Sequence, residues 1–189
     1  PTTSALVGTD IRVTNGSNVE VPRELVIASS TAETGELWFK ADSISSTTDT
    51  VLKIWYNGST IGDYASSTTY GSQNVWTNGF ELVYHMNEDP TTDVIFDSTS
   101  NSNHGVATGT LAASDLITGQ LGSGVSFEGD WYIDMLDVVI AADEDFTVSA
   151  WNRDDSHANT TTIFGASGDL HLSDSSGNYL QDIGFTSDT

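Results

Sequence analysis

One stretch near the middle of the chain, "IFDSTSNSNHGVATG" (residues 95–109), concentrates groups that bind ligands in other proteins. It holds an aspartate, two asparagines, a histidine, several hydroxyls and two glycines. Three interpretations are open: a solvated loop, a metal cradle or a recognition signature. Ca²⁺ prefers carboxylate, amide and carbonyl oxygens that converge in a tight loop. In an ordinary loop the aspartate would instead accept hydrogen bonds from the backbone that follows it, as in an Asx-turn.

Aromatic residues in polar surroundings indicate a second kind of chemistry, glycan binding. Flat rings stack on the C–H faces of sugars, and nearby amide, carboxylate and backbone groups bind the hydroxyls. The aromatic residues in polar, loop-like contexts are Trp76, Trp131, Tyr132 and Tyr179. Each could instead be a partly buried cap on a sheet edge. Three other tryptophans, Trp38, Trp55 and Trp151, lie in apolar alternating stretches and are predicted to pack in the core.

Catalytic patterns are missing from the sequence, and we expect a protein that is not an enzyme. A glycosidase needs two carboxylates facing each other across a cleft, and no Glu-x-Asp-x-x-Glu string is present. The four histidines lack the close spacing of a zinc site, and no Gly-x-Ser-x-Gly elbow occurs. Cysteine is absent, which excludes disulfides, thiolate metal sites and a cysteine nucleophile. Three sequons, Asn15, Asn57 and Asn159, would matter only in a host that glycosylates its surface proteins.

The charge of the chain excludes several partners. It has 27 acidic and 5 basic residues, a net charge of −22, and Arg153 is the one basic residue beyond residue 53. Such a chain repels phosphate backbones and anionic lipids, so nucleic acid and membrane surfaces are not expected partners. The charge indicates a highly solvated surface, or alternatively divalent-cation binding by clustered carboxylates.

The elements that must position these residues are predicted to be β-strands. Short apolar stretches alternate with turn residues about every ten positions, a pattern typical of antiparallel sandwiches and barrels. The predicted strands are residues 10–14, 24–28, 35–41, 51–56, 80–84, 125–127, 131–135, 146–151, 161–164 and 170–173. At most one helical turn is expected, within residues 115–122.

The composition also predicts two units. Residues 63–79, "DYASSTTYGSQNVWTNG", are poor in aliphatic side chains and are interpreted as a linker or long loop. A smaller β-sandwich unit would precede it over residues 1–62, and a larger β unit would occupy residues 80–189.

The larger predicted unit resembles laminin-G-like, concanavalin-A-like jelly-roll modules. The resemblance rests on "FDSTSNSNHGVATG", "TGQLGSGVSFEGDWYIDM" and "EDFTVSAW", which occur in the family's order. The matching positions are Asp97, Ser98, Asn101, Gly105, Gly119, Gly122, Phe127, Gly129, Tyr132, Ile133, Phe146, Thr147, Ser149 and Trp151. The first part of the chain, including "GELWFKADSISSTTDTVLKIWYNG", resembles an uncharacterised β-domain family that precedes such modules in prokaryotic secreted proteins and phage structural proteins.

The resemblance implies a jelly roll and a non-catalytic role at a cell, virion or other extracellular surface. It also implies a Ca²⁺ site at Asp97 with Asn101 or Asn103. We expect a structural or adhesive subunit of a repeating assembly, or alternatively a carbohydrate-binding, lectin-like module of a larger secreted protein. Pro1 cannot be an initiator residue, so we expect the chain to be processed, excised or read from the middle of a longer one. The last strands of the module are missing, so we expect either more chain after Thr189 or a segment donated by a neighbouring subunit.

An incomplete sheet has an edge that invites another strand. Other copies of the chain are therefore expected partners, with the apolar segment Ala5, Leu6, Val7 and Gly8 in contact with a neighbour.

Overall fold

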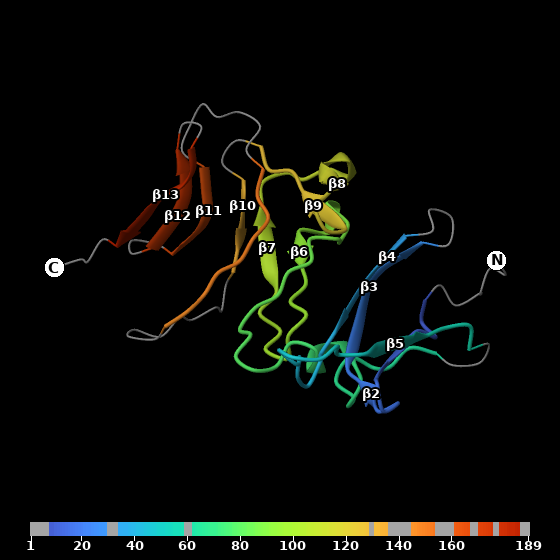
Figure 1. Cartoon of the computed structure of the whole chain (residues 1–189). Coiled ribbons are helices and arrows are strands. Elements are labelled where there is room, and N and C mark those ends of the chain that lie inside the picture. The colour runs from blue at the N-terminus through green and yellow to red at the C-terminus, as the bar shows by residue number, and fades with distance from the viewer. Residues whose placement is uncertain are drawn as a thin grey trace. The chain divides into compact units, whose positions relative to one another are not determined.

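The computed structural model describes residues 8–29, 34–58, 62–128, 131–135, 145–153, 161–166, 170–175 and 178–185. Within these ranges the protein is all-β, as predicted, and its helical residues form only three short 3-10 turns (Figure 1). Contacts divide the chain into two compact units, Pro1–Val139 and Ile140–Thr189. Among the described residues, no helix has the length and apolar character needed to cross a membrane.

The described residues of the first unit form ten short strands and the three 3-10 turns. The strands are β1 (Arg12–Asn15), β2 (Glu20–Val21), β3 (Arg23–Ser29), β4 (Thr34–Phe39), β5 (Leu52–Trp55), β6 (Val94–Ile95), β7 (Gly105–Thr108), β8 (Leu116–Thr118), β9 (Ser123–Val125) and β10 (Tyr132–Asp134). The turns are η1 (Ser72–Asn74), η2 (Pro90–Thr92) and η3 (Ala113–Asp115).

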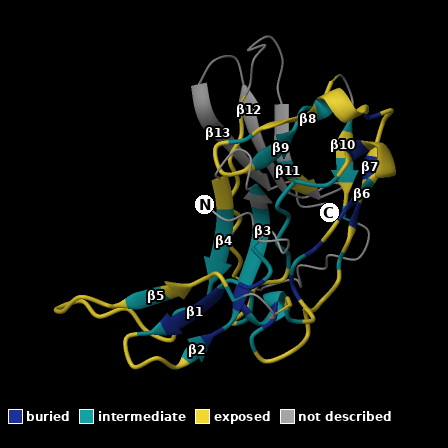
Figure 2. Cartoon of the chain, turned by 90° about the vertical axis from the view of Figure 1, so that its right-hand side faces the viewer, coloured by how far each residue is buried: buried dark blue, intermediate teal, exposed yellow. Residues whose placement is uncertain are grey.

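The first strands of the chain form a three-stranded antiparallel sheet in the order β2-β1-β5. Val13 of the central strand pairs with Val21 of β2 on one side and with Ile54 of β5 on the other. Directly opposed residues point to the same face of a sheet, so these three side chains share a face. Strand β1 is mostly buried (Figure 2). Val13 and Val21 are buried, whereas Ile54 on the edge strand is 55% exposed.

The hairpin β3–β4 is the longest pairing of the first unit. Its register runs from Arg23 opposite Phe39 to Ser29 opposite Thr34, with an irregularity between Leu25 and Ile27. The alternation of apolar and polar residues in "GELWFKA" produces β4, as the sequence predicts. Glu24 lies opposite Trp38 across this hairpin.

Residues 63–79, predicted to be a linker or long loop, pack against β3. The amide of Arg23 donates to the carbonyl of Tyr70, and the Arg23 guanidinium lies 2.6 Å from the carboxylate of Asp63. Gly71 is buried where a β-carbon would collide with the carbonyl oxygens of Ala65 and Ser66. The segment is therefore part of the first unit, and the chain divides after Val139.

A second three-stranded sheet has the order β10-β7-β6, and its strands β6 and β7 flank the polar residues 96–104. Strand β7 alternates between buried and exposed residues, with Ala107 buried opposite Ile133 of β10. Gly105 is required at this point, because a β-carbon would collide with the side chain of Ile133 and crowd the hydroxyl of Tyr84.

Residues 115–122 stay within the expected limit of one helical turn, because Asp115 ends η3 and the rest form strand β8 and a turn leading to β9. β-branched Ile117 and Thr118 favour the strand, and Gly119 closes the turn. One predicted strand, residues 80–84, is wrong. Residues 80–84 contribute only one bridge, from Tyr84 to Asp97. The amide of Val83 is bound there by a side chain, Asp97, and not by a neighbouring strand.

The described strands of the second unit form one antiparallel sheet in the order β11-β12-β13. They are β11 (Thr161–Ala166), β12 (Leu170–Ser175) and β13 (Asn178–Phe185). A further wrong strand prediction lies in the second unit, where residues 146–151 form no strand and Phe146, Val148 and Trp151 are exposed.

Candidate functional site

Asp97 is the centre of the predicted ligand-binding stretch, and it is 6% exposed. Its Oδ1 accepts hydrogen bonds from the amides of Val83 and Thr99, at 3.0 and 2.9 Å. Its Oδ2 accepts from the hydroxyl of Thr99 and the amide of Asn103, at 2.7 and 2.9 Å. The carboxylate therefore accepts four hydrogen bonds, about the number its lone pairs allow. In this arrangement Asp97 organises the loop.

The two asparagines predicted beside Asp97 turn their amide nitrogens to another residue. The Nδ2 atoms of Asn101 and Asn103 both donate to the carbonyl of Glu81, at 3.1 and 3.3 Å. Among the described residues, no three histidine, aspartate or glutamate side chains gather with the geometry of a metal site. The contacts of Asp97 match the Asx-turn interpretation of this stretch.

Tyr84 ties the loop to the segment that precedes it. Its hydroxyl donates to the carbonyl of Asn103 at 2.7 Å. Burial raises the pKa of Tyr84 to about 12, and the negative charges of Asp97 and Glu88 add to that shift. The phenol therefore stays protonated, and a hydrogen-bond donor, at any physiological pH.

A second cluster, formed by Glu24, Glu36 and His85, was not predicted from the sequence. The Nε2 of His85 lies 3.1 Å from Glu24 Oε2, and its Nδ1 lies 3.7 Å from Glu36 Oε1. Glu24 comes from β3 and Glu36 from β4, so the imidazole spans both strands of the hairpin. The remaining contacts of Glu24 are the hydroxyl of Ser98, at 2.7 Å, and the indole N–H of Trp76.

Aromatic rings enclose this cluster. Trp38 and Trp76 have ring centroids 5.2 Å apart, and each lies within 6 Å of the imidazole of His85. Phe80 packs edge-on against Trp76 at 5.3 Å. Both carboxylates accept hydrogen bonds from protein donors, so the cluster ties the hairpin to residues 76–98.

A small pocket of about 320 Å³ lies beside this cluster. Its lining residues are Glu24, Leu25, Val26, His85, Asn87, Glu88, Phe96 and Ser98. The Phe96 ring packs edge-on against His104 at 5.1 Å and remains 54% exposed, so part of its apolar surface is accessible. The pocket thus combines carboxylate, amide, hydroxyl and imidazole groups with one aromatic ring.

Two polar side chains of the small pocket are fixed in place by hydrogen bonds to the backbone. Asn87 donates from Nδ2 to the carbonyl of Val26, and Glu88 accepts at Oε1 from the amide of Phe96. The second oxygen of Glu88 is buried and has no hydrogen-bond partner among the described residues. This preorganisation lowers the entropy that a ligand must lose to bind.

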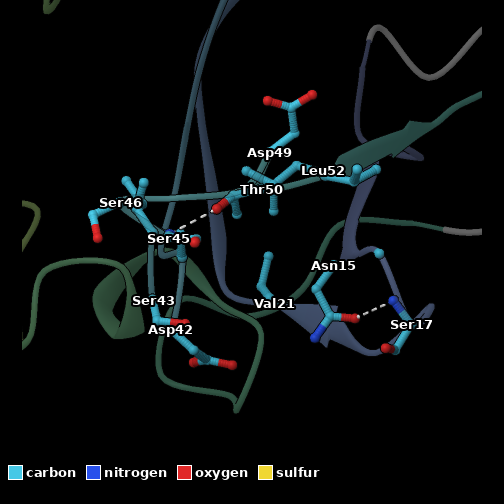
Figure 3. A pocket seen from close by; sticks show the side chains of 14 residues that line it. Asn15, Ser17, Val21, Asp42, Ser43, Ser45, Ser46, Asp49, Thr50 and Leu52 are labelled. Atoms are coloured by element: carbon cyan, nitrogen blue, oxygen red, sulfur yellow. Dashed lines mark hydrogen bonds between the residues drawn. The ribbon is translucent and has the colours of Figure 1, made fainter.

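A larger, open hollow of about 690 Å³ lies between the β1–β2 turn and the loop that leads into β5 (Figure 3). Its apolar lining includes Val21, Ile44, Val51 and Leu52. Serine and threonine hydroxyls and the carboxylates of Asp42 and Asp49 complete the lining.

The predicted glycan-binding aromatics are dispersed. Trp76 is part of the aromatic cluster, and Trp131 is partly buried where it packs on Gly109. Tyr132 is 55% exposed on β10. Tyr179 lies in β13, and its side chain is outside the described structure.

The remaining predicted positions are distributed as follows. Asn15 ends β1 and caps the following turn through its side-chain oxygen, whereas Asn57 is exposed with a φ of 72°. Gly8 begins the described part of the chain with a φ of 74°. Ala5, Leu6, Val7 and Asn159 lie outside the described residues.

Sequence reasoning missed the small pocket because its parts are far apart in the chain. Glu24 and Ser98 are separated by 74 positions, and both were inconspicuous. The one local signal was "YHMNED" (residues 84–89), where histidine, asparagine and glutamate occur together. Its sequence does not indicate which residues from distant parts of the chain lie beside His85.

No family model, curated protein or solved structure matches this chain.

Proposed function

We propose that this chain is a non-catalytic adhesive module of an extracellular, cell-surface or virion-surface protein that binds neutral glycans. The supporting observation is the small pocket, where Glu24, Asn87, Glu88 and Ser98 surround the exposed ring of Phe96. Sugar hydroxyls pair with carboxylate and amide groups, and the C–H face of a pyranose packs on an aromatic ring. A net charge of −22 disfavours acidic glycans.

The proposal includes the finer fold expected from the resemblance. The small antiparallel sheets would be parts of concanavalin-A-like jelly-roll and sandwich units, and the motif positions around Asp97 support that arrangement. In such folds, ligand sites commonly lie where loops and sheet edges meet.

The test is a glycan array followed by titration calorimetry with the best neutral oligosaccharide. Phe96→Ala should weaken binding by tenfold or more, because it removes the stacking ring. Phe127→Ala is the matched control, since Phe127 is a partly exposed ring that does not line the pocket. Loss of binding in Tyr132→Ala alone would move the site to β10, and a blank array would contradict the proposed function.

A second function, as a subunit of a repeating assembly, is favoured by residues 145–153. They are exposed and form no strand, although Phe146, Val148 and Ala150 alternate as strand residues do. A neighbouring copy that paired with this segment would bury its apolar side chains. Light scattering that shows only monomers at high concentration and high salt would end this second proposal.

A further inference from the structure

The exposed edge of strand β5 has the features of a docking site for an extended segment of another protein. In the sheet order β2-β1-β5, β5 is an edge strand. Its outer N–H and C=O groups meet no other strand among the described residues. Unpaired groups of this kind are a template for adding a strand. Figure 2 shows β5 and the residues after it as largely exposed.

Proteins commonly protect such an edge with an outward lysine, a proline or a bulge. The one lysine of β5, Lys53, does not serve in this way. Its ammonium group binds the side-chain oxygen of Asn18 at 2.7 Å and the carbonyl of Gly16 at 3.3 Å, across the sheet. The four residues of β5 pair with β1 without a register shift and contain no proline.

The apolar side chains on this edge are left without cover. Ile54 shares its face with buried Val13 and Val21, yet it is 55% exposed. Leu52 lies two residues earlier on the same strand, so it points to that face as well. It lines the 690 Å³ hollow, together with Val21 and the exposed Ile44. A strand added to β5 would place alternate side chains beside Ile54 and over this apolar lining.

The charges around the hollow identify the kind of partner. Figure 3 shows the carboxylates of Asp42 and Asp49 at opposite borders of the hollow, and no basic residue lines it. An added strand with apolar residues on one face and lysine or arginine between or beside them would pair with these carboxylates.

A second copy of this chain fits those requirements poorly. It carries the same net charge of −22, and its own β5 offers a single lysine, Lys53, between Leu52 and Ile54. We therefore propose that the β5 edge and its hollow bind an extended, basic segment of a different protein by strand addition. This site is separate from the small pocket and does not depend on the proposed glycan binding.

The test uses the full chain and three synthetic eight-residue peptides. The probe alternates lysine and valine, one control carries N-methyl groups on alternate residues, and the other replaces lysine by glutamate. The probe should bind with chemical-shift changes at residues 51–56. The N-methylated peptide should lose binding because it cannot complete the backbone ladder, and the acidic peptide should lose it through repulsion.

Two substitutions locate the site. Ile54→Ser should weaken binding of the probe about tenfold, since it removes the apolar contact at the edge. Leu121→Ser is the matched control, because Leu121 is similarly exposed in the β8–β9 turn and should leave binding unchanged. Asp42→Asn with Asp49→Asn should weaken binding about fivefold at low salt and reduce its salt dependence.

Three outcomes would overturn the proposal. One is equal binding of the probe and its N-methylated form, and another is equal loss in Ile54→Ser and Leu121→Ser. The third is a dimer that forms without peptide and disappears in Ile54→Ser, which would make a second copy the occupant. Far-ultraviolet circular dichroism of each variant establishes that it remains folded.

Discussion

At the scale of single residues, Asp97 fixes its loop by accepting two hydrogen bonds at each carboxylate oxygen. Its donors come from Val83, Thr99 and Asn103, so one buried charge joins three parts of the chain. Hydrogen bonds to a charged acceptor are stronger than neutral ones, and leaving the donors unpaired would cost more than the bonds themselves contribute.

Asp97→Asn should therefore lower the free energy of unfolding by about 2–4 kcal/mol. The asparagine keeps the shape of the side chain but replaces one acceptor by a donor that faces other donors. Urea denaturation followed by tryptophan fluorescence measures the change. Asp93→Asn is the control, because Asp93 is exposed with a φ of 57°, a conformation that asparagine tolerates. Similar values for the two variants would show that Asp97 does not organise the loop.

The raised pKa of Tyr84 leads us to expect a loss of stability at high pH. Its pKa is raised to about 12 by burial and by Asp97 and Glu88, whereas an unfolded tyrosine has a pKa of about 10. A group with a raised folded-state pKa stabilises the fold fully below the unfolded-state pKa, and this contribution is lost as the pH rises through 10 to 12. The unfolding free energy should fall more steeply over this range in the wild type than in Tyr84→Phe.

Below pH 10 the same variant should be less stable by about 1 kcal/mol, because it lacks the hydrogen bond to Asn103. Urea denaturation at half-unit pH intervals measures both effects. Parallel pH profiles for Tyr84→Phe and the wild type would contradict the assignment.

At the scale of elements, the segment 63–79 is built into the first unit by contacts that its composition does not reveal. Arg23 binds Asp63 and the carbonyl of Tyr70, and Trp76 binds Glu24. The ammonium group of Lys40, the residue that follows β4, also donates to the hydroxyl of Thr77. A segment poor in aliphatic residues is thus held by charged and aromatic side chains in place of an aliphatic core.

Gly71→Ala tests this docking. A β-carbon at position 71 would collide with the backbone carbonyls of Ala65 and Ser66, which cannot move without undocking the segment. We expect a loss of about 1–3 kcal/mol in unfolding free energy, with faster amide exchange over residues 70–75. Gly62→Ala is the matched control, because no atom lies within 4 Å of its added β-carbon. A Gly71→Ala protein as stable as Gly62→Ala would indicate that the segment is a loose linker.

The sequence predicted elements well where period-two alternation coincided with a local partner. Strands β3 and β4 form a hairpin of neighbours in sequence, and both were predicted close to their observed bounds. Residues 80–84 had the same alternation, but their partner is the side chain of Asp97, fourteen residues later. Alternation indicates which residues can form a strand and does not identify the group that satisfies the backbone.

The candidate sites also show that local sequence reveals local contacts and not long-range ones. Asp97 was singled out because its neighbours in sequence are polar, and its contacts with Thr99 and Asn103 are indeed local. The small pocket depends on Glu24 meeting His85 and Ser98 across most of the first unit. Such long-range pairing is decided by how the elements pack, which no window of the sequence contains.

At the scale of the whole molecule, the distribution of charge sets the conditions under which the chain is stable. Residues 54–189 carry twenty acidic residues and one basic residue, Arg153. Four of the five basic residues lie in the first 53 positions, and there Arg12 and Arg23 are nearly buried in contacts with Glu20 and Asp63. The first 53 residues, with seven acidic and four basic side chains, therefore keep only a small net negative charge, while the remainder depends on the solvent to screen its repulsion.

Raising the concentration of a monovalent salt should therefore raise the melting temperature. The screening length falls from about 10 Å at 0.1 M to about 3 Å at 1 M, so repulsion between acidic residues that are not in contact is largely removed. Thermal unfolding followed by circular dichroism at increasing concentrations of sodium chloride measures this effect.

The role of calcium is tested separately, by comparing the melting temperature with and without a chelator at fixed ionic strength. Because Asp97 already binds four protein donors, adding a chelator should leave the melting temperature unchanged. A drop on chelation would establish that calcium stabilises the chain after all, and a melting temperature insensitive to sodium chloride would show that charge repulsion does not limit its stability.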